Sequence, residues 1–315
     1  MNNFDISIVV PVFNEADILA QSLPEIARAV KATGLSCEII AIDDGSKDHS
    51  WDILQTISRE YEEIAAIKLS RNFGKESAIA AGLECASGAA VIIMDGDLQH
   101  PPEIIPEMIR SWKVDGFDIV EAVKTDRGKE RLSSRMGAKL FYWLMKHLTE
   151  FDLENSSDFK LLDRKVVDAH NRLPESARFF RGIVPWLGFE KAQIPFSVPD
   201  RISGRSRWSI FRLISLAIHA STSFSSAPLH IITVMGLMTF AISIILFIQT
   251  LYMKFSGLAV SGFTTVILLL LFIGSVLMVS LGIIGIYISR IFEEVKNRPR
   301  YIIEDVINHR NKTRG

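Results

Sequence analysis

The chain has 315 residues, with 35 lysines and arginines balanced by 36 aspartates and glutamates, so its formal net charge is −1. This balance excludes the strongly basic class of nucleic-acid-binding proteins, and no nucleic-acid partner is expected. The length predicts about two domains, and nearly half of the residues are hydrophobic (48%).

Short apolar runs alternate with amphipathic stretches in the first part of the chain. We expect strands at 6–12, 38–42, 66–69, 89–94 and 118–122. We expect helices within 16–33, 49–63, 75–86 and 102–112. This alternation predicts an α/β fold with right-handed crossovers and a largely parallel sheet.

Polar loops follow four of these strands. They are Pro-Val-Phe-Asn-Glu at 11–15, Asp-Asp-Gly-Ser at 43–46, Ser-Arg-Asn-Phe-Gly-Lys at 70–75 and Asp-Gly-Asp-Leu-Gln-His at 95–100. The carboxyl ends of parallel strands meet at one edge, where open α/β sheets bind ligands. Carboxylates accept hydrogen bonds from base and ribose groups, whereas Arg71 and Lys75 offer donors to phosphate or uracil oxygens. Each loop alone could be a turn or a cap, but four together favour a ligand site.

Asp95 and Asp97 follow the fourth strand one residue apart. Alternate residues of an extended segment point the same way, so the two carboxylates can share one ligand. A small number of hard oxygen ligands suits Mg²⁺ or Mn²⁺ that is also held by substrate phosphates. A solvated turn is the alternative for this pair when it is considered alone.

A basic segment and two aromatic stretches follow the predicted strands. Residues 124–139 include Arg127, Arg131 and Arg135, which suit contacts with phosphates or anionic lipids, although a solvated helix face is the alternative. The stretches 136–148 and 208–224 are bordered by basic residues and predict helices in the membrane interface. Ordinary core helices are the competing interpretation.

Two long segments without charge lie near the C-terminus. No Asp, Glu, Lys or Arg occurs between Arg212 and Lys254, or between Lys254 and Arg290. Each segment exceeds the roughly 20 apolar residues needed to cross a bilayer. We expect spans near 229–253 and 263–288, with a buried helical hairpin of a soluble protein as the alternative.

Flanking charges predict the orientation of these spans, because cytoplasmic ends carry an excess of Lys and Arg. Only Lys254 lies in the connection. The basic residues outside the hairpin are Arg201, Arg205, Arg207 and Arg212 before it, and Arg290, Lys296, Arg298 and Arg300 after it. Both termini are therefore expected in the cytoplasm, and the N-terminus lacks the pattern of a cleaved signal peptide.

The four loop motifs occur together with Ser-Asp-Phe-Lys-Leu-Leu-Asp-Arg at 157–164 and a terminal pair of spans. In this order they resemble the polyprenyl-phosphate glycosyltransferases of glycosyltransferase family 2. The resemblance to the bacterial bactoprenol glucosyltransferases covers nearly the whole chain. The resemblance to the dolichol-phosphate mannose synthases covers the soluble domain.

The resemblance implies a GT-A nucleotide-sugar domain, which is Rossmann-like, at 1–206, an interfacial helix at 207–227, two transmembrane helices at 228–290 and a cytoplasmic basic tail at 291–315. It implies inverting transfer of a sugar from a UDP-sugar to polyprenyl phosphate with Mg²⁺ or Mn²⁺, at the cytoplasmic face of the bacterial inner membrane. Glucose is the expected sugar. A homo-oligomer, for which a tetramer is one arrangement, is also implied.

Position by position, the resemblance also implies roles for individual residues. The expected nucleotide-binding residues are Pro11, Phe13, Glu15, Asp43, Asp44, Arg71, Lys75 and Asp95. The expected metal ligands are Asp95, Asp97 and Gln99. The expected phosphate- and acceptor-binding residues are Arg127, Arg131, Arg135, Arg201, Arg205 and Arg207.

Asp158 matches the proposed catalytic aspartate of the family, and Asp97 is expected to act with it. The acceptor is a phosphate monoester whose second pKa is near about 6, so the nucleophile is already anionic. We therefore expect Asp158 mainly to orient the acceptor or the metal, or to remove a residual proton, while basic residues reduce the repulsion between the two anionic substrates.

Three other functions are compatible with parts of the sequence. The same reaction could use an aminoarabinose derivative, N-acetylglucosamine or mannose. A processive polysaccharide synthase would need more spans than two, and its Gln-x-x-Arg-Trp motif is absent from the sequence. A noncatalytic membrane scaffold would not need charged residues at four strand ends.

Overall fold

The computed structural model describes residues 4–124, 157–174, 180–196, 227–256 and 262–307. These residues form two compact units. The sheet unit contains the described residues up to 196 together with those from 299 onward, and the helical unit contains the described residues from 227 to 298. The chain therefore leaves the sheet unit for the helical unit and then returns to it.

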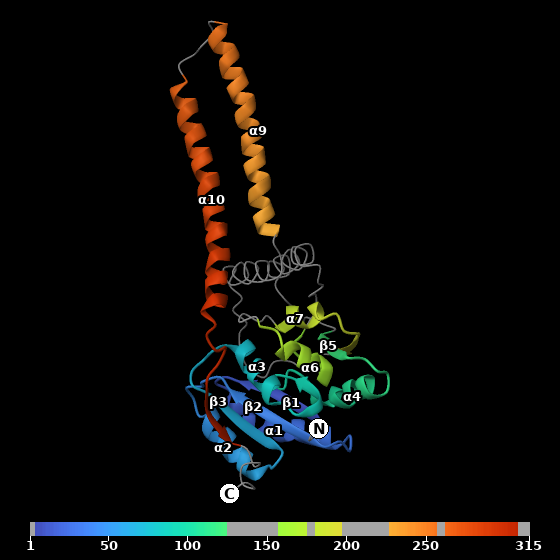
Figure 1. Ribbon diagram of the computed structural model, residues 1–315. Helices are drawn as coiled ribbons and strands as arrows, with labels where there is room; N and C mark the ends of the chain where they lie inside the picture. Colours follow the sequence, from blue (N-terminus) through green and yellow to red (C-terminus); the bar gives the residue numbers. More distant parts are fainter. Residues whose placement is uncertain (1–3, 125–156, 175–179, 197–226, 257–261, 308–315) are drawn as a thin grey trace. The chain divides into compact units, whose positions relative to one another are not determined.

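One mixed sheet organises the sheet unit. Its described strands are β1 (Phe4–Val12), β2 (Cys37–Asp43), β3 (Ile64–Leu69), β4 (Gly88–Ile93), β5 (Ile119–Lys124), β6 (Lys160–Asp163), β7 (Lys191–Phe196) and β8 (Ile303–Ile307). Figure 1 labels β1, β2, β3 and β5 among them, and the full order in the sheet is β7-β5-β6-β4-β1-β2-β3-β8. β1 to β4 are parallel to one another, as predicted. β6 runs antiparallel between β4 and β5, and β8 is antiparallel to β3, so the sheet is less parallel than the sequence predicts.

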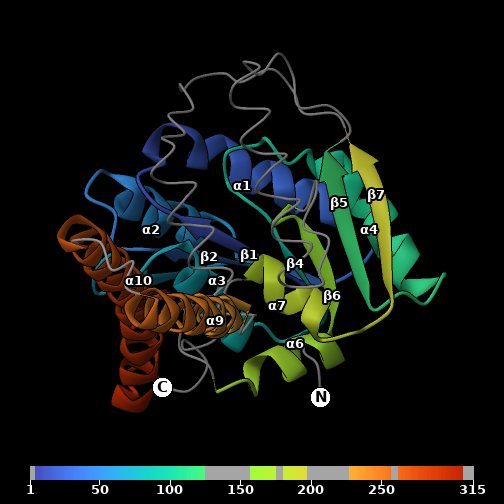
Figure 2. The same ribbon diagram turned by 90° about the horizontal axis from the view of Figure 1, so that it is seen from above.

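Helices cover both faces of this sheet (Figure 2). They are α1 (Ala16–Lys31), α2 (Ser50–Glu60), α3 (Lys75–Cys85), the short 3-10 turn η1 (Pro102–Ile104), α4 (Ile105–Lys113), α6 (Arg164–Asn171) and α7 (Phe180–Trp186). Alternate residues of β1 point to opposite faces. Ile8 therefore packs in the core formed with α1, α2 and α4, whereas Val9 packs in the core formed with α3, α6 and α7.

Gly82 lets α3 lie close to the sheet. A Cβ atom at this position would come within 2.3 Å of Val9 Cγ1 and 2.8 Å of Ile42 Cδ1. Alanine is favoured over glycine in a helix by about 1 kcal/mol, but overpacking a core costs about 1 to 3 kcal/mol. The second effect is expected to dominate, because β-branched Val9 has little freedom to move.

We expect Gly82→Ala to lower the free energy of unfolding of the sheet unit by about 1 kcal/mol. Thermal unfolding of the solubilised protein measures the change. Gly236→Ala is the matched control, since Gly236 is also helical and an added Cβ there meets no described atom within 4 Å. An unchanged or higher melting temperature in Gly82→Ala would show that α3 can move away from the sheet without cost.

The residues that follow the helical unit add β8 to the edge of the sheet. Ile303 pairs with Leu69, and the Ser70 amide donates to the Ile302 carbonyl at 2.9 Å. Tyr301 Oη donates to Glu84 at 2.6 Å, and Arg300 donates to the Leu173 carbonyl at 2.7 Å. The segment 291–315, which was predicted only as a basic tail, thus contains the strand β8. The start of this strand lies beside Ser70, the first residue of the third polar loop.

The helical unit consists of α9 (Ala227–Phe255) and α10 (Phe263–Lys296), which contact each other. Both helices are long and apolar enough to cross a membrane, over Ile232–Thr250 and Phe272–Lys296. Many of their large apolar side chains are exposed, and the buried hairpin of a soluble protein stays the alternative interpretation. The predicted helices at 136–148 and 208–224, and nearly all of the interfacial helix at 207–227, lie outside the described residues.

Candidate functional site

The four polar loops meet at the carboxyl edge of the parallel strands. In the register of the sheet Val12 lies beside Asp43, and Val9 lies beside Ile93, so β1, β2 and β4 end at the same edge. The first two loops interlock: the Asn14 amide donates to Ser46 Oγ at 2.9 Å, and the Lys47 amide donates to Asn14 Oδ1 at 2.8 Å. Asn14 has φ of +54°, a conformation that asparagine tolerates better than most residues.

Asp44 joins the second loop to the third. Its two carboxylate oxygens accept the amides of Phe73 and Gly74, at 2.7 and 2.9 Å. Gly45 has φ of +65°, and a Cβ atom there would come within 2.4 Å of the Arg71 backbone. Asp44 is buried and fixes the shape of the third loop.

Asp43 has a different environment from Asp44. One of its oxygens accepts the Ser46 amide at 3.1 Å, whereas buried Oδ2 has no hydrogen-bond partner among the described residues. Burial raises the pKa of Asp43, and the hydrogen bond from Ser46 opposes that rise. Because a buried acceptor without a donor is costly, Asp43 is suited to a ligand that brings a donor.

Lys75 joins the third loop to the fourth. Its ammonium group lies 2.6 Å from Asp95 Oδ1 and 2.7 Å from Asp158 Oδ2. Burial alone would lower the pKa of Lys75, but the charges of Asp95 and Asp158 outweigh it and raise the pKa. Lys75 is the first residue of α3, so the helix start places its ammonium group between the two carboxylates.

Asp158 reaches this edge because β6 is antiparallel to β4. Lys160, the first residue of β6, pairs with Ile93, the last residue of β4. The residues that precede β6 therefore lie beside those that follow β4. This register brings together two carboxylates, Asp95 and Asp158, that are 63 positions apart in the sequence.

Arg181, which no sequence motif singles out, completes this cluster. Its Nε and Nη2 donate to the two oxygens of Asp158 at 2.6 and 2.9 Å. Burial alone would raise the pKa of Asp158, but the hydrogen bond from Arg181 and the charges of Lys75 and Arg181 bring that pKa well below its usual range. Asp158 is therefore ionised at neutral pH and is a weak base in this arrangement.

His100 contacts the segment of Asp95 and the segment of Asp158. The Asp95 amide donates to His100 Nδ1 at 3.1 Å, which places the imidazole proton on Nε2 when the ring is neutral. The His100 ring stacks on Phe159, with centroids 5.1 Å apart. A single buried ring thus links the backbone of Asp95 to the neighbour of Asp158.

Lys160 and Glu121 form a buried ion pair next to the cluster. Both side chains are almost completely enclosed, and Lys160 Nζ donates to Glu121 Oε1. Burial lowers the pKa of Lys160, and Glu121 opposes the change. Each residue compensates the charge of the other, which a buried charge requires.

Glu15 lies near the acidic pair of the fourth loop. Burial, followed by the charges of Asp95 and Asp97, raises the pKa of Glu15 to about 8. Its Oε2 atom is buried without a hydrogen-bond partner in the described part of the chain. Glu15 is thus a carboxyl group whose charge is disfavoured until a cation or a donor approaches.

The remaining predicted residues have varied positions. Pro11 is buried in β1, Phe13 is exposed, and the Arg71 guanidinium lies 4.3 Å from the centroid of the Phe73 ring. The Gln99 backbone N–H donates to Asp97 Oδ1 at 3.1 Å, and the role of the Gln99 side chain as a metal ligand stays a prediction. The six predicted phosphate- and acceptor-binding residues, Arg127, Arg131, Arg135, Arg201, Arg205 and Arg207, lie outside the described residues.

The fourth loop fits a divalent cation that is shared with a substrate. Asp95 and Asp97 offer the oxygen ligands that Mg²⁺ and Mn²⁺ prefer, and the ammonium of Lys75 already places positive charge against Asp95. Among the described residues no group of three or more His, Cys, Asp or Glu could hold a metal ion. Substrate phosphate oxygens and water suit the coordination positions that two carboxylates leave open, and the side-chain amide of Gln99 is the further predicted ligand.

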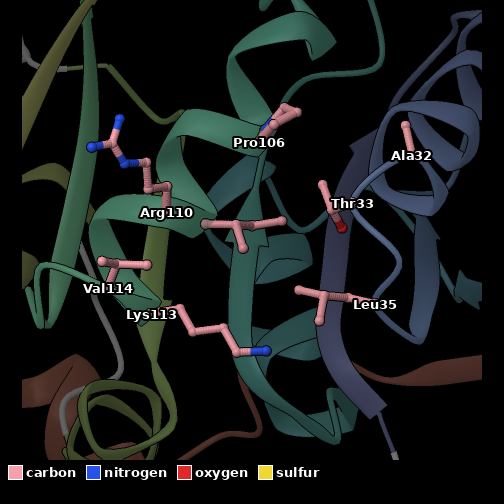
Figure 3. Close-up of a pocket in the computed structure, with 8 residues that line it drawn as sticks. Ala32, Thr33, Leu35, Pro106, Arg110, Lys113 and Val114 are labelled. Carbon is pink, nitrogen blue, oxygen red and sulfur yellow. The ribbon is translucent and has the colours of Figure 1, made fainter.

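Figure 3 shows a surface pocket between residues that follow α1 and residues of α4. It is lined by Ala32, Thr33, Leu35, Pro106, Ile109, Arg110, Lys113 and Val114. The segments that follow α1 and α4 lead into the amino ends of β2 and β5, which is the edge opposite the four polar loops. The pocket contains none of the predicted site residues, and we assign it no role in the chemistry.

Glu76 contacts the backbone next to Arg181, which is part of the cluster of Lys75, Asp95, Asp158 and Arg181. The Phe180 amide, next to Arg181, donates to Glu76 Oε2 at 2.9 Å. Burial raises the pKa of Glu76 to about 7, Asp158 adds to the rise, and the Phe180 amide, Arg181 and Lys75 oppose it. The folded protein therefore holds this proton more tightly than the unfolded chain between about pH 4.5 and 7, and stability decreases as pH rises through that range.

We expect Glu76→Gln to remove this contribution. The variant should gain apparent melting temperature relative to the unmodified protein as pH rises from 5 to 7, with a constant difference above pH 7. The slope is at most about 1.4 kcal/mol per pH unit. Thermal unfolding across the pH range measures it, and Glu60→Gln, at the exposed end of α2, is the control. Equal slopes in Glu76→Gln and the unmodified protein would contradict a titrating Glu76.

A family model described as glycosyl transferase family 2 matches residues 7–170, just over half of the chain. The chain therefore belongs to glycosyltransferase family 2 and is a glycosyltransferase, as the resemblance implies. It is 37% identical to the bactoprenol glucosyl transferase of Shigella phage SfII, over 95% of this chain and 97% of that protein. It is also 37% identical to an uncharacterized glycosyltransferase of Synechocystis, over 96% of this chain and 95% of that protein.

Solved structures share the fold. Glucosyl-3-phosphoglycerate synthase of Mycobacterium tuberculosis, solved with Mn²⁺, UDP-glucose and phosphoglyceric acid, superposes with a TM-score of 0.51 at 18% identity. The match covers 70% of this chain and 80% of that chain. The predicted GT-A fold is confirmed.

Proposed function

We propose that this glycosyltransferase moves a sugar, expected to be glucose, from a UDP-sugar to polyprenyl phosphate, with inversion at the anomeric carbon and a divalent cation. One observation carries the proposal: carboxylates and cations from separate loops converge at one sheet edge, in a chain that also has two long apolar helices. The names of relatives support the lipid carrier, since several that align over most of this chain are called bactoprenol glucosyl transferases.

The second and third loops would bind the nucleoside. Asp43 Oδ2 is the acceptor without a described donor, so it would accept a hydrogen bond from uracil or ribose. Asp44 would act through the third loop, because both of its oxygens already accept amides of that loop. Arg71, held over Phe73, would offer cationic donors to uracil or phosphate oxygens.

The fourth loop would bind the diphosphate. Asp95 and Asp97 would hold Mg²⁺ or Mn²⁺, which would stabilise the charge that develops on the leaving diphosphate. Lys75 would contribute a positive charge beside them. The assignment is supported by the mycobacterial synthase, which shares this fold and was solved in complex with Mn²⁺ and UDP-glucose.

Asp158 would act as a permanent negative charge. The acceptor phosphate is already anionic near neutral pH, so it can attack the anomeric carbon from the side opposite the diphosphate without strong base catalysis. A carboxylate held by Lys75 and Arg181 is a poor proton acceptor. Asp158 would therefore orient the groups around the reacting phosphates.

The membrane arrangement is part of the proposal. The apolar helices would anchor the enzyme in the bacterial inner membrane with both termini and the sheet unit on the cytoplasmic side, in agreement with the flanking basic residues. The expected homo-oligomer stays a prediction, and the mass of the detergent-solubilised protein tests it.

The experiment is a donor panel. Purified protein would be incubated with polyprenyl phosphate and one radiolabelled nucleotide sugar at a time, with and without a chelator. Label from UDP-glucose should enter the organic phase, and the chelator should prevent it. Label that enters the organic phase from a different donor would identify that donor's sugar as the one transferred, in place of glucose. Label in a water-soluble polymer would indicate a processive synthase. No incorporation from any donor would contradict sugar transfer to this lipid.

A further inference from the structure

Arg181 is an arginine that is held in place by described residues which accept only some of its N–H donors. A guanidinium group has five N–H donors. Two of them, one on Nε and one on Nη2, point at the oxygens of Asp158. The side chain of Arg181 is 41% exposed, whereas that of Asp158 is 7% exposed, so the arginine lies on the open side of the pair.

The backbone that carries Arg181 is also fixed. The neighbouring Phe180 is buried, its amide donates to Glu76, and its ring makes an edge contact with His170 at 6.1 Å between centroids. A bidentate ion pair fixes the plane of the guanidinium group as well. Arg181 is therefore oriented before any ligand binds, which lowers the entropic cost of a contact.

The charges around Asp158 favour an anionic ligand. Two cations, Lys75 and Arg181, share this one carboxylate. Lys75 has three N–H donors and lies on two carboxylates, Asp95 and Asp158, and its side chain is also 41% exposed. A divalent cation on Asp95 would leave positive charge in excess on this side of the site. Phosphate oxygens match both the charge and the planar donors of an arginine.

We propose that Arg181 binds a phosphate group of a substrate and that Asp158 holds the guanidinium in position for it. The inference rests on the proposed function, in which two phosphate-bearing substrates meet at this edge. The phosphate belongs either to the nucleotide donor or to the lipid acceptor. Both sources offer the same oxygen atoms, so separate binding measurements distinguish them.

The test uses Arg181→Gln and Arg181→Lys in the full-length, solubilised protein. Binding of UDP with Mn²⁺ is measured by calorimetry without lipid, and KM for polyprenyl phosphate is measured in the transfer assay. Because the hydrogen bonds are charge-assisted, Arg181→Gln should weaken UDP binding or raise KM for polyprenyl phosphate by roughly 10- to 100-fold. Arg181→Lys should recover part of the loss because it keeps the charge without the fork of donors.

The matched control is Arg172→Gln. Arg172 is exposed at the end of α6, and its replacement removes the same charge. It should leave UDP affinity and KM unchanged. Thermal unfolding of each variant shows whether the fold is kept.

Each outcome has one meaning. Weaker UDP binding with unchanged KM for the lipid assigns the donor diphosphate, and a higher KM with unchanged UDP binding assigns the acceptor phosphate. Unchanged values for both would overturn the proposal and leave Arg181 a structural partner of Asp158. The UDP measurement needs no lipid, so it tests whether Arg181 contributes to UDP binding even where the proposed lipid acceptor proves wrong.

Discussion

Asp158→Asn is expected to lower the rate of sugar transfer by about 100- to 1000-fold. The replacement keeps the size of the side chain but removes its negative charge. Lys75 and Arg181, which both contact this carboxylate, would then repel each other with no charge between them, although Lys75 would keep its contact with Asp95. The planar pairing with the arginine would be lost. The measurement is the initial rate at which label from the nucleotide sugar enters the organic phase.

Asp168→Asn is the control for this variant. Asp168 is half exposed on α6, where it lies 3.8 Å from Arg164. The same loss of charge there should leave the rate unchanged. Wild-type turnover in Asp158→Asn, with lipid binding intact, would rule out an essential role for Asp158.

The residual activity of Asp158→Asn also tests the role of Asp158 as a base. The pKa of Asp158 lies well below its usual range, so the residue does not titrate between pH 5 and 8. The acceptor phosphate has its second pKa near about 6 and should give the rate an acid limb. That limb should persist in the variant, and its disappearance would mean that Asp158 itself accepts a proton.

The first four strands and their loops could be predicted because each strand is an apolar run that ends in polar residues. Parallel strands that alternate with helices fix which ends meet, so Asp43 and Asp95 could be placed at one edge from the sequence alone. The structure has these strands within a few residues of the predicted bounds.

The fifth predicted strand, at 118–122, lies close to β5 (Ile119–Lys124), but β6 and β8 escaped prediction for physical reasons. β6 has only four residues, and its first residue is the buried lysine Lys160, which is polar in the sequence and compatible with a core only because Glu121 lies opposite. β8 pairs with β3 across more than 230 positions, and most of its side chains are exposed. Neither strand has the local apolar pattern that identifies a strand.

Arg181 was missed for a related reason. Its importance depends on α7 packing against α3 through Phe180 and Glu76, and no spacing in the sequence encodes that contact. Asp158 could be selected only through the resemblance to the family. Its environment depends on the antiparallel direction of β6, which the sequence does not indicate.

Replacing a carboxylate of the acidic pair, Asp95 and Asp97, is the second change for which we expect a large effect. Asp95 contacts Lys75 in the structure, so its replacement would disturb the cluster around Asp158 as well as a cation. Asp97 is the cleaner position to change, since its carboxylate accepts the amide of Gln99 within the same loop. The charge of this carboxylate also contributes to the raised pKa of Glu15.

We expect Asp97→Asn to weaken Mn²⁺ binding in the presence of UDP by roughly 100-fold and to lower the transfer rate at least as much, because a carboxylate ligand is replaced by a neutral amide. The electron paramagnetic resonance signal of free Mn²⁺ measures binding independently of activity. Asp115→Asn, an exposed position that follows α4, is the matched control and should bind Mn²⁺ as the unmodified protein does. Equal Mn²⁺ affinity in Asp97→Asn and Asp115→Asn would remove Asp97 from the metal site.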